Sequence, residues 1–337
     1  MSSSRPAHHR QDGGFRNPWP TATPRGAGGV LRWQRERRTR TLAPNPPATA
    51  LRRATPRIAL PYVAAGEARI TWIGQSSFLI QLPGCNALVD PVFGHRASPV
   101  PWAGPRRFAP PGITIEELPP IDLVLLSHDH YDHLDRGSIV RLRRKFGERV
   151  LWVTPLGYRG WLRRLRISKL AELDWWASTA IDTSSGVARV QALPAQHWTR
   201  RNPFTVSRRL WASFLIEASG MRVYFGGDTG YFPEFTAIGQ RAGPFDAVLL
   251  PIGAYDPPWF MRPMHMNPEE AVTAYRELGA TGVFAAMHWG TFRLSDEDPL
   301  EPPARLQDAW RAARLNGHSL WIPALGETRF LQPACPA

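Results

Sequence analysis

Short runs of apolar residues, separated by turn residues, begin near Ala68. Three runs follow one another at residues 68–74 (ARITWIG), 76–82 (SSFLIQL) and 86–90 (NALVD), with a Pro-Gly dipeptide between the last two. Strand-forming runs bounded by turn residues are typical of neighbouring antiparallel strands. We therefore expect a β-meander at the start of the folded region.

The next apolar run, at residues 121–127 (IDLVLLS), contains almost no polar positions. A strand that is buried on both faces shows this pattern. After it, Ile139, Leu142 and Phe146 recur at helical spacing. Residues 136–147 are therefore expected to form a helix directly after the buried strand.

The second half of the chain repeats strands and helices in a new order. Strands are predicted over 187–195, 210–218, 221–227, 246–253 and 281–288, and helices over 231–243, 267–280 and 304–316. The clearest helix has Asn267 as its N-cap, Pro268 at its first position and Gly279 near its end. Two sheet-rich halves, each flanked by helices, predict an α+β fold, namely a four-layer αβ/βα sandwich.

Residues 1–65 lack this pattern and are rich in Arg, Pro, Gly and Ser. Such a composition predicts an irregular or partly ordered N-terminal extension, followed by one domain over residues 66–332. Neither a signal peptide nor an apolar stretch of membrane-spanning length is present in the sequence. The sequence therefore predicts a cytoplasmic protein, with peripheral attachment to the inner membrane face as an open alternative.

The formal net charge of +13 raises the question of an anionic partner such as nucleic acid or a membrane. Only Lys145 and Lys169 of the 41 basic residues are lysines, so arginine is used throughout the chain and coding bias explains most of the charge equally well. No specific nucleic-acid partner is expected. Cys85 and Cys335 are too few and too far apart in the sequence for a disulfide framework.

The segment SHDHYDHLD brings four metal-binding side chains into six residues directly after the buried strand: His128, His130, Asp132 and His133. In an extended segment, His128 and His130 point to the same side and can meet one metal ion. Asp132 and His133 follow on the turn and can reach a second ion. The His8–His9 pair, in contrast, is interpreted as a solvated polar tract.

A metal pair needs further ligands, and His197, Asp228 and His288 each follow a predicted strand. All three are therefore expected at the same edge of the sheets. Imidazole and carboxylate ligands without a thiolate suit zinc, and the carboxylate of Asp228 can offer one oxygen to each of two ions. Trp198 and Trp289 are expected to pack around these ligands.

Longer strings extend well beyond these ligands. They are ELPPIDLVLLSHDHYDHLD, ELDWW, QHW, GDTGY, GPFD, IGAYDPPWFM, NPEEAV and MHWGTF, together with FRNPWPTATPRGAGGVLRW near the N-terminus. With these strings the chain resembles the metallo-β-lactamase superfamily and, within it, the N-acyl-phosphatidylethanolamine-hydrolysing phospholipase D family. The resemblance runs from about Gly14 to Phe330.

The resemblance implies two Zn²⁺ ions and assigns each of the seven candidate ligands to one or both of them. The implied ligands are His128, His130 and His197 for one ion, Asp132, His133 and His288 for the other, and Asp228 between the two. Asp90, in the string LVDP, matches the acidic residue that supports the metal-binding loop.

The resemblance also implies residues on the substrate side. Asp228 and His265 are the expected catalytic residues, and His265 falls where the family has a histidine near the substrate phosphate. Tyr131 and Arg200 are expected to contact the same phosphate. Two positions depart from the family pattern: Gln75 stands where a histidine is common, and Asp129 where an amide is common.

These observations together predict a zinc-dependent phosphodiesterase of the phospholipase D type. A hydroxide that bridges the two metal ions would attack the phosphorus of N-acyl phosphatidylethanolamine or a related phospholipid. One alternative is another hydrolase of the same fold, a lactonase or a nucleotide phosphodiesterase. The second alternative, a non-enzymatic module that binds nucleic acid or a membrane, would require an inert metal site.

Overall fold

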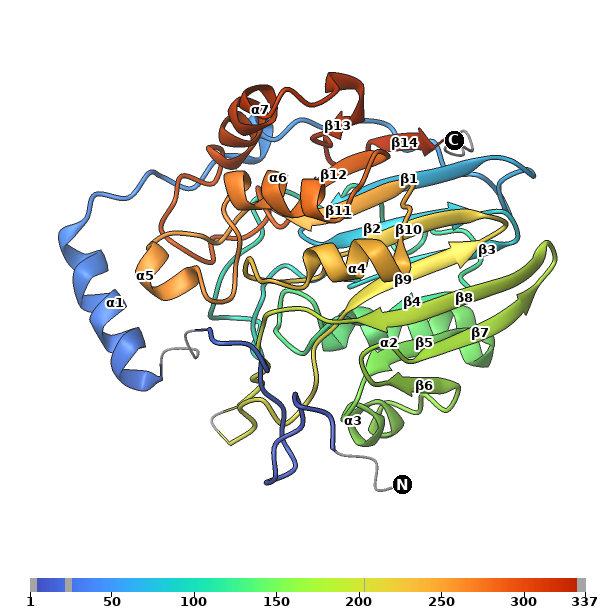
Figure 1. The fold of residues 1–337 in the computed structure, drawn as a ribbon, viewed down its shortest axis with the longest axis horizontal. Coiled ribbons are helices and arrows are strands. Elements are labelled where there is room, and N and C mark those ends of the chain that lie inside the picture. The colour runs from blue at the N-terminus through green and yellow to red at the C-terminus, as the bar shows by residue number, and fades with distance from the viewer. Residues whose placement is uncertain (1–4, 22–25, 203, 332–337) are drawn as a thin grey trace.

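The computed structural model describes residues 5–21, 26–202 and 204–331 of the chain, so that Cys335 lies outside the described residues. Two seven-stranded sheets lie face to face, and helices cover their outer faces (Figure 1). Helices α4 (Phe235–Ala242) and α6 (Pro268–Glu277) lie in front of the sheets in this view, and α2 (Arg136–Phe146) lies behind them.

The first sheet begins with the predicted meander. Its strands, in spatial order, are β14 (Thr328–Leu331), β1 (Ala68–Gly74), β2 (Ser77–Leu82), β3 (Cys85–Val89), β4 (Leu123–Leu125), β5 (Leu151–Pro155) and β6 (Leu170–Leu173). The β1, β2 and β3 strands pair antiparallel in sequence order, whereas β3 to β6 pair in parallel. β4 is buried along its whole length, as its apolar run predicts.

The second sheet also has seven strands, and its strand numbers decrease from one edge to the other. They are β13 (Leu320–Trp321), β12 (Val283–Met287), β11 (Ala247–Pro251), β10 (Met221–Phe225), β9 (Ser213–Ala218), β8 (Gly186–Leu193) and β7 (Ser178–Thr183). The strands from β10 to β13 pair in parallel, and those from β7 to β10 pair antiparallel. Parallel strands in both sheets bring several strand ends to one edge of the molecule.

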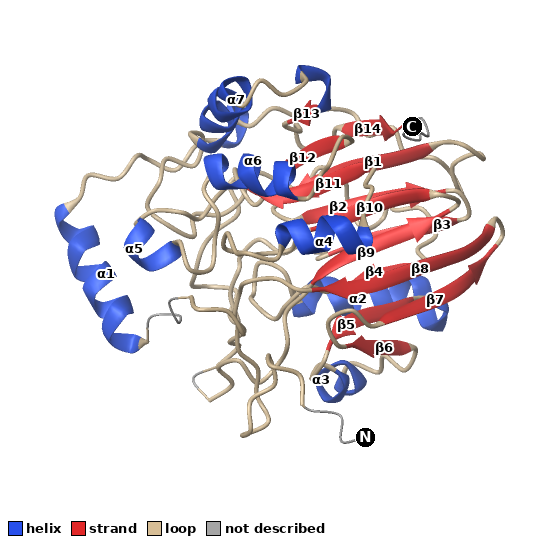
Figure 2. Cartoon of the chain, viewed as in Figure 1, coloured by secondary structure: helices blue, strands red, loops and turns tan. Residues whose placement is uncertain are grey.

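Helices complete the sandwich (Figure 2). The remaining ones are α1 (Ala27–Thr39), α3 (Arg159–Arg164), α5 (Pro258–Met261) and α7 (Pro302–Ala312), with short 3₁₀ turns at Ala48–Ala50, Gly147–Arg149 and Gly317–Ser319. α6 begins with the expected cap: the Asn267 side chain accepts from the Glu270 N–H, and the Glu270 side chain accepts from the Asn267 N–H.

Three apolar layers separate the four structural layers. Ile70, Phe78 and Phe214 belong to the central cluster between the two sheets. Ile139, on α2, packs with residues of the outer face of the first sheet, and Trp310, on α7, packs with residues of the outer face of the second. The α+β four-layer sandwich is therefore confirmed.

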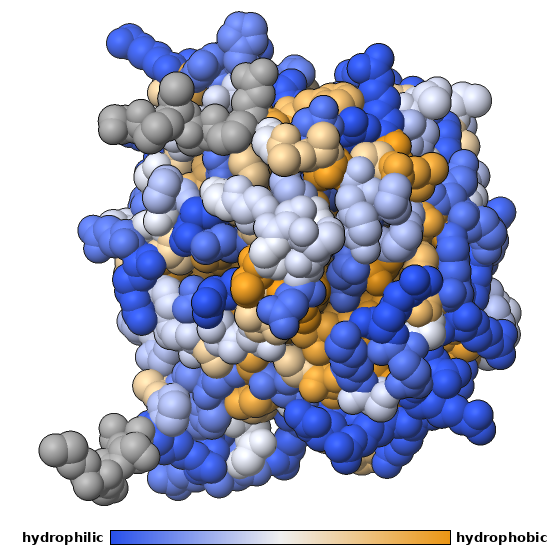
Figure 3. Space-filling view, turned by 90° about the vertical axis from the view of Figure 1, so that its right-hand side faces the viewer, coloured by the Kyte–Doolittle hydropathy of each residue, from blue (hydrophilic) through white to orange (hydrophobic). Residues whose placement is uncertain are grey.

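The surface at the right-hand side of Figure 1 is largely hydrophilic, with apolar side chains gathered mainly near the middle of that face (Figure 3). Among the described residues, no helix is both long enough and apolar enough to cross a membrane.

The central apolar layer provides a first test. Phe214 is fully buried between the sheets, so Phe214→Ala is expected to lower the free energy of unfolding by about 3–5 kcal/mol because a cavity remains. The matched variant Phe204→Ala removes a side chain that is 90% exposed and should change it by less than about 0.5 kcal/mol. Urea unfolding measures both, and equal effects would contradict this account of the core.

Candidate metal centre

The predicted metal-binding side chains meet at one edge of the two sheets. His128, His130, Asp132 and His133 lie in the loop between β4 and α2. The other three follow strands of the second sheet: His197 follows β8, Asp228 follows β10 and His288 follows β12. The structure thus brings together all seven residues, in two groups that share Asp228.

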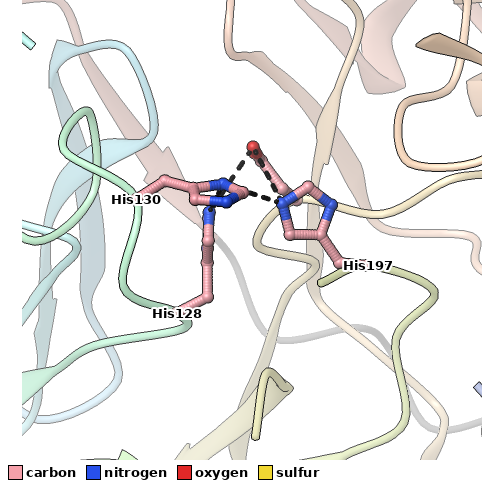
Figure 4. Close-up of side chains that lie close together, drawn as sticks. His128, His130 and His197 are labelled. Carbon is pink, nitrogen blue, oxygen red and sulfur yellow. Dashed lines mark hydrogen bonds and ion pairs between the residues drawn. The ribbon is translucent and has the colours of Figure 1, made fainter. Parts of the chain in front are cut away.

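The first group consists of His128, His130, His197 and Asp228. The three histidines point toward one another (Figure 4). His130 Nδ1 lies 3.0 Å from His128 Nε2 and 3.2 Å from His197 Nε2. Asp228 Oδ2 lies 3.8 Å and 3.9 Å from the same two Nε2 atoms. A zinc ion about 2.0–2.2 Å from each ligand keeps the ligand atoms roughly 3–4 Å apart, so these distances fit one ion.

The second group consists of Asp132, His133, Asp228 and His288. His133 Nε2 lies 3.1 Å from Asp228 Oδ1 and 3.3 Å from Asp132 Oδ2. His288 Nε2 lies 3.2 Å from Asp132 Oδ2 and 3.1 Å from Asp228 Oδ2. The spacing is again that of ligands around one ion, and Asp228 is the residue common to both groups.

Several atoms of these groups have no other role in the structure. His133 Nε2, His288 Nε2 and Asp228 Oδ1 are buried, and within the described part of the chain none of them makes a hydrogen bond of acceptable geometry. Buried polar atoms are almost always satisfied, so orphaned atoms that converge on one point need a ligand there. Imidazole nitrogens and carboxylate oxygens fit divalent metal ions such as zinc.

Neighbouring groups fix the orientation of the second group. His133 Nδ1 donates to Asp90 Oδ2 at 2.6 Å, which directs Nε2 of the same ring toward Asp132 and Asp228. Asp90 also accepts from the backbone N–H of Ser127 at 2.7 Å and from its hydroxyl. Asp90, which the resemblance predicts to support the metal-binding loop, therefore contacts His133, one of the predicted ligands.

Burial sets the protonation of four histidines. It lowers the pKa of His128, His130 and His197 below the ordinary value and that of His265 to about 4. These rings are therefore neutral at pH 7, and a neutral imidazole keeps one lone pair free. His197 Nδ1 donates to the Met264 carbonyl at 3.0 Å, so the free lone pair of His197 is on Nε2, which faces the first group.

The two remaining histidines behave differently in the metal-free chain. Burial opposes their protonation, but the carboxylates of Asp228 and Asp132 outweigh it. The pKa of His133 is therefore raised well above its ordinary value, and that of His288 is raised to about 9. Both are protonated at pH 7 until a metal ion displaces the proton.

The residues expected near the phosphate lie at different places. His265 Nδ1 is buried without a hydrogen-bond partner among the described residues and lies 3.8 Å from Asp228 Oδ2. The Tyr131 hydroxyl donates to the Arg201 carbonyl, and the Arg201 guanidinium lies 4.2 Å from the centre of the Tyr131 ring. The backbone N–H of Arg200 donates to Asp129 Oδ1.

A cleft of about 560 Å³ lies beside the metal-binding loop. Tyr131, Trp161 and three arginines, Arg96, Arg136 and Arg201, contribute to its walls. The sequence singled out Tyr131 but missed these arginines, because no spacing distinguishes them from the many other arginines of the chain. Their charge makes the cleft suitable for an anionic group.

Gln75 and Asp129, the two positions that depart from the family pattern, both make hydrogen bonds at or near the candidate site. Gln75 Nε2 donates to Asp132 Oδ2 at 2.9 Å, so the glutamine holds a carboxylate of the second group. Asp129 accepts from the Arg209 guanidinium at 2.8 Å as well as from Arg200. Trp198 packs edge-to-face on His130, and Trp289 stacks on Trp72.

Comparison with known proteins identifies relatives of this chain. Residues 85–289 match the family described as "Beta-lactamase superfamily domain". The chain is 37% identical to N-acyl-phosphatidylethanolamine-hydrolyzing phospholipase D 1 of Caenorhabditis elegans over 71% of this chain and 68% of that protein. It is 35% identical to the mitochondrial N-acyl-phosphatidylethanolamine-hydrolyzing phospholipase D of Saccharomyces cerevisiae, over 77% of this chain and 55% of the yeast protein.

A solved structure supports the fold alone. Igni18, a metallo hydrolase of Ignicoccus hospitalis, superposes with a TM-score of 0.58 at 22% identity, over 78% of this chain and 98% of that chain.

The variant Asp90→Asn tests whether Asp90 orients His133 for metal binding in the second group. An amide cannot replace the carboxylate as acceptor for His133 and Ser127 equally well, so metal affinity should fall by about 10–100-fold. Competition with a chromogenic chelator measures the affinity. Asp182→Asn, an exposed carboxylate on β7, is the matched control and should bind metal like the wild type; an equal loss in both variants would contradict the role of Asp90.

Metal binding should also release protons. Because His133 and His288 carry protons at pH 7 in the metal-free chain, loading both groups is expected to release about two protons, and fewer above pH 9 where His288 is already neutral. Calorimetric titration of the metal-free protein in buffers of different ionisation enthalpy counts the released protons. Absence of release at pH 7 would contradict the raised pKa values.

Proposed function

Because this chain belongs to the metallo-β-lactamase superfamily and is related to phospholipases D within it, we propose that it is a dinuclear zinc phosphodiesterase. The proposed substrate is N-acyl phosphatidylethanolamine or a related phospholipid, and the products are a phosphatidic acid and an N-acylethanolamine. The coarser conclusion, a metal-dependent hydrolase of this fold, is independent of the substrate.

The observation that carries the proposal is the pair of ligand groups joined at Asp228. Two divalent ions there would supply Lewis acidity for the phosphoryl oxygens and a nucleophilic water near neutral pH. Both Asp228 oxygens face these groups, and the nearby histidines hold the pKa of Asp228 well below its ordinary value against the opposing effect of burial. Asp228 is therefore ionised at neutral pH and can accept a hydrogen bond that orients the attacking water.

His265 is the proposed donor to the phosphate. Its ring lies beside those of His197 and His288, with both centroid distances at 5.3 Å, and is not a member of either ligand group. With its pKa lowered to about 4, it is neutral at pH 7 and can donate one N–H to a phosphoryl oxygen without adding a charge. The arginines of the adjacent cleft, which Tyr131 also lines, provide the anionic part of the lipid with a counter-charge.

We propose that exposed side chains attach the protein to a lipid surface, and that the methionine-rich segment 254–266 does not. Met261, Met264 and Met266 are buried, so they pack inside the protein. Leu31, on α1, is 70% exposed. The exposed α1 residues Arg35 and Arg38 would add attraction to anionic head groups, of about 1 kcal/mol per charge.

The substrate is tested with purified, zinc-loaded protein and N-acyl phosphatidylethanolamine in mixed micelles. We expect phosphatidic acid and N-acylethanolamine by mass spectrometry, and turnover at background level in the double variant His130→Ala/Asp228→Ala. His318→Ala removes an exposed histidine on a distant 3₁₀ turn and should leave turnover unchanged.

Intact lipid, combined with cleavage of a simple phosphodiester such as bis(p-nitrophenyl) phosphate, would overturn the lipid substrate and favour a nucleotide phosphodiesterase. Cleavage of a lactone instead would favour the lactonase alternative.

A further inference from the structure

Residues 8–19, which we call the strap, lie against the loop that carries His197. We infer that Asn17 and Trp19 of the strap are positioning residues for His197, so that the N-terminal segment completes the first ligand group. The inference rests on the proposed metal centre, and it concerns residues that belong to neither of the two ligand groups.

The loop that carries His197 has turns but no regular secondary structure. Residues 194–212 connect β8 to β9, and their described part contains neither helix nor strand. Its internal hydrogen bonds, such as that from the Ser207 N–H to the Thr199 carbonyl at 2.7 Å, are few, so contacts with other segments help to hold its side chains in place. The strap supplies some of these contacts: the Phe15 N–H donates to the Ser207 carbonyl at 2.8 Å, and the Arg208 side chain donates to the Asp12 carbonyl.

The strap approaches this loop very closely at Gly14. A Cβ at that position would lie 2.8 Å from the Ser207 carbonyl oxygen, so only glycine fits without displacement. The close contact between the strap and the loop therefore requires glycine at position 14.

The start of the strap is tied down by His8 and His9, which are not the solvated tract that their sequence suggested. Nε2 of His8 lies 2.6 Å from Asp174 Oδ1, and Nε2 of His9 lies 2.8 Å from Asp174 Oδ2. These are hydrogen-bond lengths, shorter than the 3.0–3.9 Å between ligand atoms of the first group. We therefore interpret this cluster as an anchor and not as a third metal site.

Aromatic stacking joins the two ends of the strap. The buried ring of Trp175 stacks with His8 at 4.3 Å and with Trp19 at 5.7 Å between ring centroids. Trp19 also packs on Phe232 at 4.8 Å. The anchor at His8 and the contact at Trp19 therefore share one buried partner, which fixes the strap as a unit.

Two side chains of the strap, Asn17 and Trp19, make hydrogen bonds to His197 and to its neighbour Gln196. Asn17 Nδ2 donates to the His197 backbone carbonyl at 3.2 Å. Trp19 Nε1 donates to Gln196 Oε1 at 2.7 Å, which leaves Gln196 Nε2 to donate to the Pro263 carbonyl at 2.9 Å. The strap thus fixes the backbone of His197 on one side.

The same chain of contacts reaches the other face of His197. Pro263 precedes Met264, whose carbonyl accepts from His197 Nδ1, and the segment continues directly into His265. Trp19 therefore acts, through Gln196, on the segment that sets the tautomer of His197 and carries His265. Partners that orient a metal ligand in this way typically change metal affinity by about 10–100-fold.

Trp19→Phe is the sharpest test, because it keeps an aromatic ring for stacking and removes the N–H donor together with part of the indole. Asn17→Ala is the second variant. Trp102→Phe is the matched control, since Trp102 is 77% exposed and belongs neither to the strap nor to the loop that carries His197. Each protein is titrated with zinc against a chelator, and the visible spectrum of its cobalt(II) form is recorded.

We expect the affinity for one of the two ions to fall about ten-fold or more in both strap variants. The affinity for the other ion and the thermal midpoint of the metal-free protein should stay at the wild-type values, and the cobalt spectrum should change. Trp102→Phe should match the wild type in all three measurements.

Wild-type affinity and an unchanged cobalt spectrum in both strap variants would overturn the inference. Equal weakening of both ions together with a lower thermal midpoint of the metal-free protein would also overturn it, because that result indicates general destabilisation. Failure of the metal centre itself is distinguishable, since His130→Ala would then leave the metal content of the protein unchanged.

Discussion

The rest of the structure depends on the buried carboxylate of Asp228, at the point where the two sheets present their strand ends. A buried, ionised carboxylate is costly unless positive charge lies close to it. In the metal-free chain the protons on His133 and His288 supply that charge, which is why the pKa of both histidines is raised. Metal ions would supply it in their place. The raised histidine pKa values and the unsatisfied atoms thus have one physical origin.

The fold meets this constraint by bringing parallel strands of both sheets to a common edge. β4, β10 and β12 are largely buried, but they end short of the ligands, so the ligand side chains lie on connecting segments. Their geometry then depends on hydrogen bonds from behind: Asp90 holds His133, Met264 holds His197 and Gln75 holds Asp132. The buried strands place the ligands approximately, and these partners orient them.

Much of this arrangement could be predicted from residue pattern. The apolar runs locate β1 to β4 and most strands of the second sheet, and the density of metal-binding residues in 128–133 indicates the site. The runs at β5 and β6 were not recognised as strands, because short apolar stretches between helices carry little periodicity. The contact of Gln75 with Asp132 was also missed, since pairing across 57 residues leaves no local signal.

The N-terminal residues make specific contacts with the domain that composition does not reveal. An Arg- and Pro-rich segment is expected to be irregular or partly ordered, because it has little apolar surface to bury. In the structure, the domain presents a buried carboxylate at Asp296 and a partly buried one at Asp174, and both need partners. The side chain of Asp296 is fully buried and accepts from Trp33 Nε1 at 2.7 Å, with Arg37 at 3.1 Å, both on α1. Asp174 receives His8 and His9 in the same way. The order of the extension therefore follows from unpaired charge in the domain, which the composition of the extension alone does not reveal.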